Sequence, residues 1–348
     1  MSNIRFISNE LAKHHSNGRF HPESPQRIEI LEQWLQSHPD DRISYELLAE
    51  VASEADITSV HAPQHYHLVE KTQETEGFFH FDGDTAANQY TFDAARQAVA
   101  VGKKSVWESD LDTSVFCLTR PPGHHATRGA AQGFCIFNNI AAATELAIQE
   151  KKYHRIAILD VDHHFGNGTA NIHENTPNIL YASVHASPRI AYPGNSGYVD
   201  EIGKGEGRGF NICVPLDFRA TEADIGLAFD QLILPIISQF RPDFLAISVG
   251  FDAFEQDPLG VLGVTNEGFG LIGSHIQQIA SELKIPCAHF LEGGYNIQML
   301  PTLLQSYISP LIHPEKDLSM SAKSLKPKSQ TTATLERLNT LLGEYWEL

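Results

Sequence analysis

The stretch Ile158-Leu159-Asp160-Val161-Asp162-His163-His164-Phe165-Gly166-Asn167-Gly168 decides how this chain is built. An apolar, strand-like segment runs directly into carboxylates, imidazoles and glycines. Alternate side chains of an extended chain share one face, so Asp160, Asp162 and His164 point to the same side. Asp162 and His164 can bind one cation, and oxygen and nitrogen ligands without thiolates suit zinc or a neighbouring divalent metal. For this stretch alone, the alternative is the ion-paired end of a buried strand.

Length and composition fit one large domain. A chain of 348 residues with 42% hydrophobic residues can bury a large core, and no linker divides it. We find no apolar run close to the roughly 20 residues of a membrane span and no N-terminal signal core. The four cysteines lack CxxC spacing and are expected to be reduced core residues. These features predict a cytoplasmic protein without membrane segments.

The charge of the chain limits its partners. A formal net charge of −18 argues against direct nucleic-acid binding, which needs clustered Lys and Arg. Cationic partners are electrostatically favoured, although an acidic composition also serves solubility alone. The sequence leaves a homo-oligomer open.

Short apolar runs alternate with helical patterns along the chain. This alternation predicts an α/β fold: a single domain with an open, mainly parallel β-sheet and helices on both faces. Ser24 and Pro25 predict an N-cap and first helical position for a helix that packs on the sheet. The expected strands are Ile4 to Ile7, Val115 to Leu118, Ile156 to Leu159, Ile179 to Val184, Phe210 to Val214, Phe244 to Val249 and Cys287 to Leu291, with helices at Ile140 to Gln149, Ile225 to Phe240 and Phe269 to Leu283.

Four of these strands run into reactive residues. Open α/β sheets bind ligands at the carboxyl ends of their strands, so the four segments are expected to form one site. Asp252 can complete a set of metal ligands with Asp162 and His164 and leave a position open for water. The segments after the strands are Arg120 to His125, Asp160 to Gly168, Gly250 to Asp252 and Glu292 to Tyr295.

The remaining residues of this predicted site suit hydrolysis. His124 and His125 can transfer protons between a metal-bound water and a leaving amine, and Asp160 and Asn167 can fix the tautomers of the rings. Tyr295 can donate a hydrogen bond to the oxygen of a tetrahedral intermediate. Taken singly, the His pair also fits turn packing and the tyrosine a structural role.

At this point the chain resembles the arginase/deacetylase superfamily, specifically the zinc-dependent histone deacetylase family (class II-like) with its bacterial amidohydrolase and acetylpolyamine amidohydrolase relatives. The resemblance covers most of the chain and makes residues 1–313 the catalytic domain and residues 314–348 its C-terminal tail with a docking helix, expected at Leu335 to Trp346. The matching motifs are His21 to Arg27, Asp82 to Thr85, Arg120 to His125, Gly133 to Cys135, Asp160 to Gly168, Gly250 to Pro258 and Glu292 to Tyr295.

The resemblance implies roles for these residues. One zinc ion is bound by Asp162, His164 and Asp252; His125 is the general base and acid, and His124 its electrostatic partner. Tyr295 polarises the acyl carbonyl, and Asp160 and Asn167 support the two histidines. A structural potassium ion is implied at Asp160, Ser183, Val184 and the backbone of Asp162 and His164. Phe134 and Tyr192 are the tunnel walls, with Gly133 and Gly294 also contacting substrate and Leu259 at the rim, and Arg27 lines an internal cavity below.

The chain departs from the family pattern at one position. In the family pattern, one spacer residue after the first aspartate ligand is followed by His-His-Gly. The corresponding residues of this chain are His163-His164-Phe165-Gly166. The two-residue step from Asp162 to His164 is kept, but Phe165 cannot supply the hydrogen bond of a second imidazole, which puts metal affinity or rate in question.

The sequence therefore predicts a zinc-dependent amidohydrolase that removes acetyl or related acyl groups from the ε-amino group of lysine in proteins or peptides. An amidohydrolase of acetylpolyamines or other small acylamines is the nearest alternative, and the apolar Leu259 favours acyl-lysine over it. A catalytically weak acyl-lysine-binding module is the second alternative. His61, His65 and His67 are expected to have packing or surface roles, and His14 and His15 to lie at the pocket rim.

Overall fold

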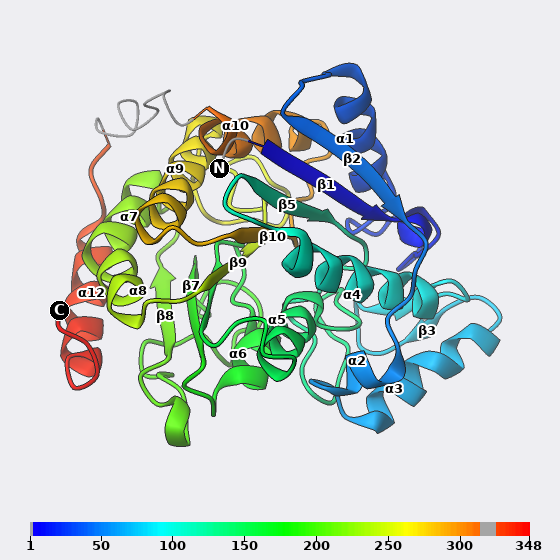
Figure 1. Cartoon of the computed structure of the whole chain (residues 1–348), viewed down its shortest axis with the longest axis horizontal. Helices are drawn as coiled ribbons and strands as arrows, with labels where there is room; N and C mark the ends of the chain where they lie inside the picture. Colours follow the sequence, from blue (N-terminus) through cyan, green and yellow to red (C-terminus); the bar gives the residue numbers. More distant parts are fainter. Residues whose placement is uncertain (1–2, 314–324) are drawn as a thin grey trace.

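The computed structural model describes residues 3–313 and 325–348 and is built on one parallel sheet (Figure 1). Its strand order is β2-β1-β5-β10-β9-β6-β7-β8, and every neighbouring pair is parallel. The predicted α/β class and open parallel sheet are confirmed. The strands are β1 Asn3–Asn9, β2 Ile43–Leu48, β5 Thr113–Leu118, β6 Ile156–Asp160, β7 Ile179–Ala186, β8 Asn211–Leu216, β9 Phe244–Val249 and β10 Cys287–Leu291.

Alternation along the strands builds a core on each face of the sheet. In β5, Phe116 and Leu118 enter the core under one layer of helices, whereas Val115 and Cys117 enter the core under the other. The first layer contains α1 Gln26–Ser37, α7 Glu222–Ala228, α8 Leu234–Phe240, α9 Asn266–Leu283, α10 Leu300–Ile312 and α12 Ser329–Leu342, and the second contains α4 Thr91–Glu108, α5 Asn139–Gln149 and α6 Asn167–His173 (Figure 1).

A smaller cluster lies beyond α4 and α5. The short helices α2 Glu54–Thr58 and α3 Pro63–Glu70 bury Ile57 and Tyr66 against Phe92 and Phe137. A two-stranded antiparallel ribbon, β3 Phe79–His80 with β4 Ala86–Ala87, follows them in the chain. This ribbon carries the motif Asp82 to Thr85 in its turn.

Two element boundaries differ from the sequence predictions. Helix α1 begins at Gln26 and has Pro25 at its N-cap, so Ser24 lies one residue too early to cap it. Helix α12 begins at Ser329, before the expected Leu335, and ends at Leu342. Its polar first turn is anchored by Thr331, which is buried and whose Oγ1 donates a 2.6 Å hydrogen bond to Asp224. The predicted tail segment 314–324 lies outside the described residues.

One helical segment, Glu222–Phe240, is long and apolar enough to cross a membrane by length and composition. This finding corrects our expectation that no segment reaches that length. Half of the segment is buried inside the protein, where Ile225, Phe229 and Leu232 join the core, and a buried core helix passes the same test. A π-helical turn, Phe229–Ile233, separates α7 from α8, whose first turn contains Pro235.

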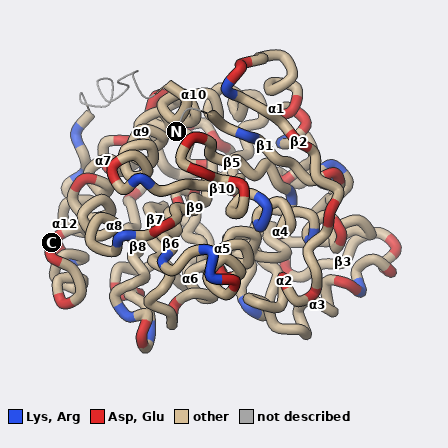
Figure 2. The backbone as a smooth tube through the Cα atoms, viewed as in Figure 1, with Lys and Arg blue, Asp and Glu red and all other residues tan. Residues whose placement is uncertain are grey.

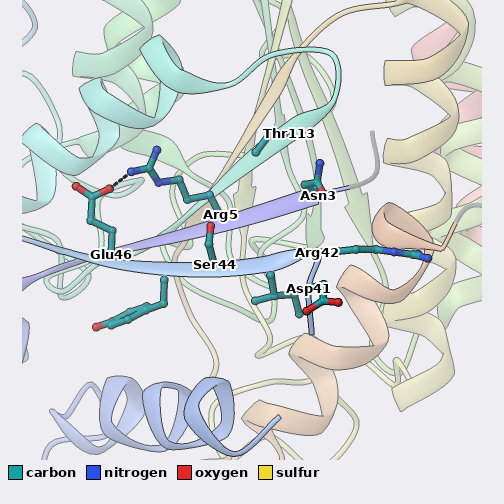
Figure 3. Close-up of a pocket in the computed structure, with 9 residues that line it drawn as sticks. Asn3, Arg5, Asp41, Arg42, Ser44, Glu46 and Thr113 are labelled. Carbon is teal, nitrogen blue, oxygen red and sulfur yellow. Dashed lines mark hydrogen bonds and ion pairs between the residues drawn. The ribbon is translucent and has the colours of Figure 1, made fainter. Parts of the chain in front are cut away.

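A cavity of about 620 Å³ lies at the amino ends of β1, β2 and β5 (Figure 3). Asn3 and Thr113, which face each other at the start of β1 and β5, line it. Arg5 points across it to Glu46 and is also paired with Glu108 at 2.8 Å, so its charge is balanced within the chain (Figure 3). This cavity is therefore at the opposite end of the strands from the predicted site.

Lys and Arg are spread over many elements and are interspersed with Asp and Glu (Figure 2). Several of the basic side chains are paired, including Lys104 with Glu108 and Lys103 with Asp56. The charges of these lysines are therefore balanced by acidic neighbours within the chain.

Candidate active site

Four adjacent strands deliver the predicted site residues to one edge of the sheet. The strands β5, β10, β9 and β6 are consecutive in the sheet order, and each is followed by one of the four predicted segments. Because all four strands are parallel, their carboxyl ends lie together. The sheet therefore brings residues about 170 positions apart in the sequence into contact, as Glu292 Oε2 accepts a 2.7 Å hydrogen bond from the Gly123 N–H.

The three predicted metal ligands meet at this edge. The candidate ligand atoms of Asp162, His164 and Asp252 all lie within 4.8 Å of one another. His164 Nδ1 is 3.0 Å from Asp252 Oδ2 and 3.5 Å from Asp162 Oδ1. Both carboxylates are buried, and two buried carboxylates facing one imidazole require a compensating positive charge. The donor set thus fits a divalent cation such as zinc.

Backbone groups hold the two carboxylates in place. The Gly293 N–H donates to Asp162 Oδ2 at 2.8 Å, and the His163 N–H donates to Asp252 Oδ1 at 3.1 Å. Glycine is required at position 293, because a Cβ there would lie 2.2 Å from Asp252 Oδ2. A side chain at this turn would therefore displace Asp252, a predicted metal ligand.

The electrostatics of the cluster predict that metal and proton compete for it. Burial opposes the charged form of His164, but Asp162 and Asp252 raise the pKa of its imidazole to about 9. Below that pH the ring of the metal-free chain carries a proton that zinc must displace. We expect the apparent zinc affinity to rise with pH, by up to about tenfold per unit below pH 9. Titration against a zinc-buffering chelator at several pH values measures this slope, and an affinity independent of pH would contradict it.

The two neighbouring histidines have opposite charge preferences. Burial opposes the charge on His124, yet Asp162 and Asp160 raise its pKa to about 10, and its Nδ1 lies 3.1 Å from Asp160 Oδ2. Burial together with the positive charge of His124 and His164 holds the pKa of His125 well below its usual value. In the metal-free chain these pKa shifts favour a cationic His124 and a neutral His125, which is the form that can accept a proton.

Asn167 orients the neutral ring. Its Oδ1 lies 2.8 Å from His125 Nδ1, so Nδ1 carries the hydrogen and Nε2 is left to act as a base. The His125 ring also packs against Gly133, where a Cβ would lie 2.6 Å from the imidazole.

A pocket of about 290 Å³ reaches this constellation. Its buried residues His125 and Tyr295 lie at the inner end, and the exposed Asp84 and half-exposed Leu259 lie at the mouth. Phe134 meets the Tyr295 ring edge-to-face at 5.8 Å and has φ of +69°, an uncommon conformation for an aromatic residue. The full lining is Asp84, His125, Gly133, Phe134, His164, Ile190, Ala191, Tyr192, Leu259 and Tyr295.

The sequence missed three lining residues and misplaced one. Asp84 belongs to the motif Asp82 to Thr85, which was noted without a role, whereas Ile190 and Ala191 carried no signal. Gly294, predicted to contact substrate, does not line the pocket. It packs behind the wall with φ of +115°, and its carbonyl accepts a 2.7 Å hydrogen bond from Arg27 Nε.

Arg27 lies beneath the site and is not among the residues that line the 290 Å³ pocket. It is fully buried, paired with Glu23 at 3.4 Å, and donates to the Glu292 carbonyl at 2.5 Å. This ion pair and these hydrogen bonds hold the Gly-Gly-Tyr turn, and the internal cavity expected beside Arg27 stays a prediction.

Phe165 is buried in an aromatic environment. Its ring packs 4.8 Å from the ring of His185 and 6.0 Å from that of Tyr181. Both neighbours form hydrogen bonds elsewhere: Tyr181 donates to Asp160, and His185 contacts Ser183 and Gly197. The phenylalanine therefore leaves neither of these polar neighbours without a partner.

The histidines that were expected to have packing or surface roles do not line the pocket. His61 and His65 are buried, and the Asn138 N–H donates to His61 Nε2, whereas His67 is half-exposed beside Glu70. His15, predicted at the pocket rim, is buried and contacts Thr91 Oγ1 at 2.9 Å. The rim expectation is wrong for His15, because the polar loop folds inward around buried Glu23.

Comparisons with known proteins agree with this arrangement. The family model of the histone deacetylase domain matches residues 21–311. Histone deacetylase 5 of Arabidopsis thaliana is 32% identical over 97% of this chain and 52% of its own length. A probable deacetylase of Methanothermobacter thermautotrophicus is 37% identical over 70% of this chain and 72% of its own length.

A solved structure matches nearly the whole fold. The crystal structure of the HDA15 HD domain superposes with a TM-score of 0.87 at 30% identity and covers 99% of this chain and 95% of that one. The chain spans about half the length of the Arabidopsis relative. It carries a histone deacetylase domain, and it belongs to the histone deacetylase family.

Proposed function

We propose that this chain removes acetyl or related acyl groups from the ε-amino group of lysine in proteins or peptides, with zinc bound by Asp162, His164 and Asp252. The observation that carries the proposal is the 290 Å³ pocket, whose aromatic residues Phe134 and Tyr192 lead from an exposed mouth to a proton-transfer pair and a metal-ligand cluster. A pocket lined by aromatic rings suits the extended apolar stem of lysine.

The residues divide the reaction among themselves. Bound zinc supplies a Lewis acid for the acyl carbonyl and lowers the pKa of water. His125, with Nδ1 held by Asn167, accepts the proton of the attacking water at Nε2 and returns it to the leaving amine. The Tyr295 hydroxyl donates a hydrogen bond to the oxygen on which negative charge develops.

The first experiment is hydrolysis of a fluorogenic acetyl-lysine peptide by protein of measured metal content, with acetylspermidine in parallel. We expect zinc-dependent turnover of the peptide. Stoichiometric zinc without turnover of either substrate would contradict the proposal and favour a binding module.

Acetylpolyamine hydrolysis is the second candidate, and one observation favours it. Asp84 places a carboxylate at the mouth, with Asp82 close by, where an ammonium group of a polyamine could bind. All residues of the inner pocket are shared by the two reactions, so only the mouth can discriminate between them.

Leu259 offers a direct test of this discrimination. We expect Leu259→Glu to raise kcat/KM for acetylspermidine relative to acetyl-lysine peptide by about fivefold, because an ion pair at a half-exposed site is worth up to about 1 kcal/mol. Leu259→Gln is the uncharged control of similar size. An equal change in both variants would show that charge at the rim does not select the substrate.

We also propose a structural potassium ion at Asp160, Ser183 and Val184 and the backbone carbonyls of Asp162 and His164. Asp160 and Ser183 are partners in the register of β6 and β7, and both are buried. The carboxylate of Asp160, whose Oδ2 accepts from Tyr181 and lies 3.1 Å from His124 Nδ1, would supply an oxygen ligand suited to a hard cation.

A further inference from the structure

The buried carboxylate of Asp257 joins two loops that meet at the pocket. Its Oδ2 accepts hydrogen bonds from the N–H groups of Tyr295, at 2.7 Å, and Asn296, at 3.0 Å. Its Oδ1 accepts a third, at 2.9 Å, from the Leu259 N–H. Only 7% of Asp257 is exposed, so water contributes little to these contacts. One side chain thus connects the Tyr295 turn to the pocket mouth.

The turn before Tyr295 needs such an external support. Gly293 and Gly294 have no side chains to pack, and glycine gives the backbone the widest conformational freedom. From one side, Arg27 Nε donates to the Gly294 carbonyl at 2.7 Å. From the other side, Asp257 Oδ2 accepts a hydrogen bond from the N–H of Tyr295, the residue that follows Gly294. The backbone direction at Tyr295 is therefore set between an arginine donor and an aspartate acceptor.

The Tyr295 hydroxyl has no hydrogen-bond partner among the described residues, so it does not orient its own side chain by such a contact. Its ring contacts Phe134 edge-to-face and lies 5.1 Å from the Arg27 guanidinium carbon. The position of the hydroxyl in the pocket consequently depends on where the backbone places the ring.

We propose that Asp257 is a positioning residue that holds the Tyr295 backbone so that the hydroxyl reaches the acyl oxygen, and that it ties this position to Leu259 at the mouth. This inference rests on the proposed deacetylation. Asp257 itself does not line the pocket and acts through Tyr295.

The test is a double-mutant cycle on kcat for an acetyl-lysine peptide. We expect Asp257→Ala to lower kcat at least about tenfold in the wild-type background, because small displacements of a reacting group cost up to about a hundredfold. In the Tyr295→Phe background the same change should cost less than about twofold, since no hydroxyl remains to be positioned. Equal factors in the two backgrounds would overturn the proposal.

Asp257→Asn is the conservative variant and serves also if Asp257→Ala fails to fold. Its amide oxygen can still accept from Tyr295 and Asn296, while its NH₂ group faces the Leu259 N–H. We expect kcat within about threefold of wild type and a KM raised severalfold. A kcat loss that is the same with and without the Tyr295 hydroxyl would contradict the positioning role.

Asp224→Ala is the matched control. Asp224 is also buried and accepts from the Lys328 and Thr221 N–H groups, but it connects α12 to α7 away from the pocket. Its replacement should lower Tm without changing kcat. A wild-type protein that does not hydrolyse acetyl-lysine would instead refute the proposed function, which keeps the two failures distinct.

Discussion

Replacing His125 with alanine is expected to lower kcat for an acetyl-lysine peptide by about two to four orders of magnitude, the usual contribution of a general acid and base. His125 is the neutral member of the histidine pair, and its Nδ1 is held by Asn167 at 2.8 Å. Alanine removes the only group proposed to accept the proton of water. Steady-state hydrolysis with measured zinc content gives the result.

The zinc content separates lost chemistry from lost metal. His125 is not among the predicted ligands, so His125→Ala should retain zinc. His154→Ala is the control, because His154 is exposed and precedes the amino end of β6, away from the site. A zinc-loaded His125→Ala protein with wild-type turnover would show that another group is the base.

Replacing Asp252 with alanine is expected to remove zinc and lower turnover by at least about a thousandfold, because the Lewis acid contributes several kcal/mol to the reaction. The change leaves Asp162 and His164 as the remaining ligands and frees the His163 N–H that now donates to Asp252. Metal analysis after dialysis, together with peptide hydrolysis, measures both effects.

The surface residue Asp243 is the control for this experiment. It accepts from the His154 and Arg155 N–H groups just before β6, so Asp243→Ala changes local stability without touching the site. Stoichiometric zinc and full activity in Asp252→Ala would show that the cluster is not the metal site.

The ends of the strands could be read from sequence. The apolar runs before Arg120, Asp160, Gly250 and Glu292 are buried on both faces of the sheet, and such strands appear as continuous hydrophobic segments. The edge strand β2 was missed because it pairs on one side only and exposes Tyr45 and Leu47, so its pattern is mixed. A strand that is buried on both faces can therefore be predicted from its continuous hydrophobic sequence, whereas a partly exposed edge strand cannot.

The roles of residues whose contacts are distant in the sequence could not be predicted from the sequence in this way. Nothing near Asp257 in the sequence indicates that it accepts hydrogen bonds from Tyr295 and Asn296, and Ile190 and Ala191 enter the pocket from a loop without a motif. His15 lies in a polar loop whose composition is typical of the protein surface. The loop folds over Glu23, and His15 is buried.

By itself, the sequence determined the α/β class, the parallel sheet and the residues at the four strand ends, because hydrophobic periodicity is a local property and the alternation of strands with helices favours parallel strands. Only the tertiary structure decided which of those residues touch. The strand order places β10 and β9 between β5 and β6, and this order makes Asp162, His164 and Asp252 one cluster and separates the charge preferences of His124 and His125. Contacts and pKa values depend on distances in space, which strand order sets and sequence spacing does not.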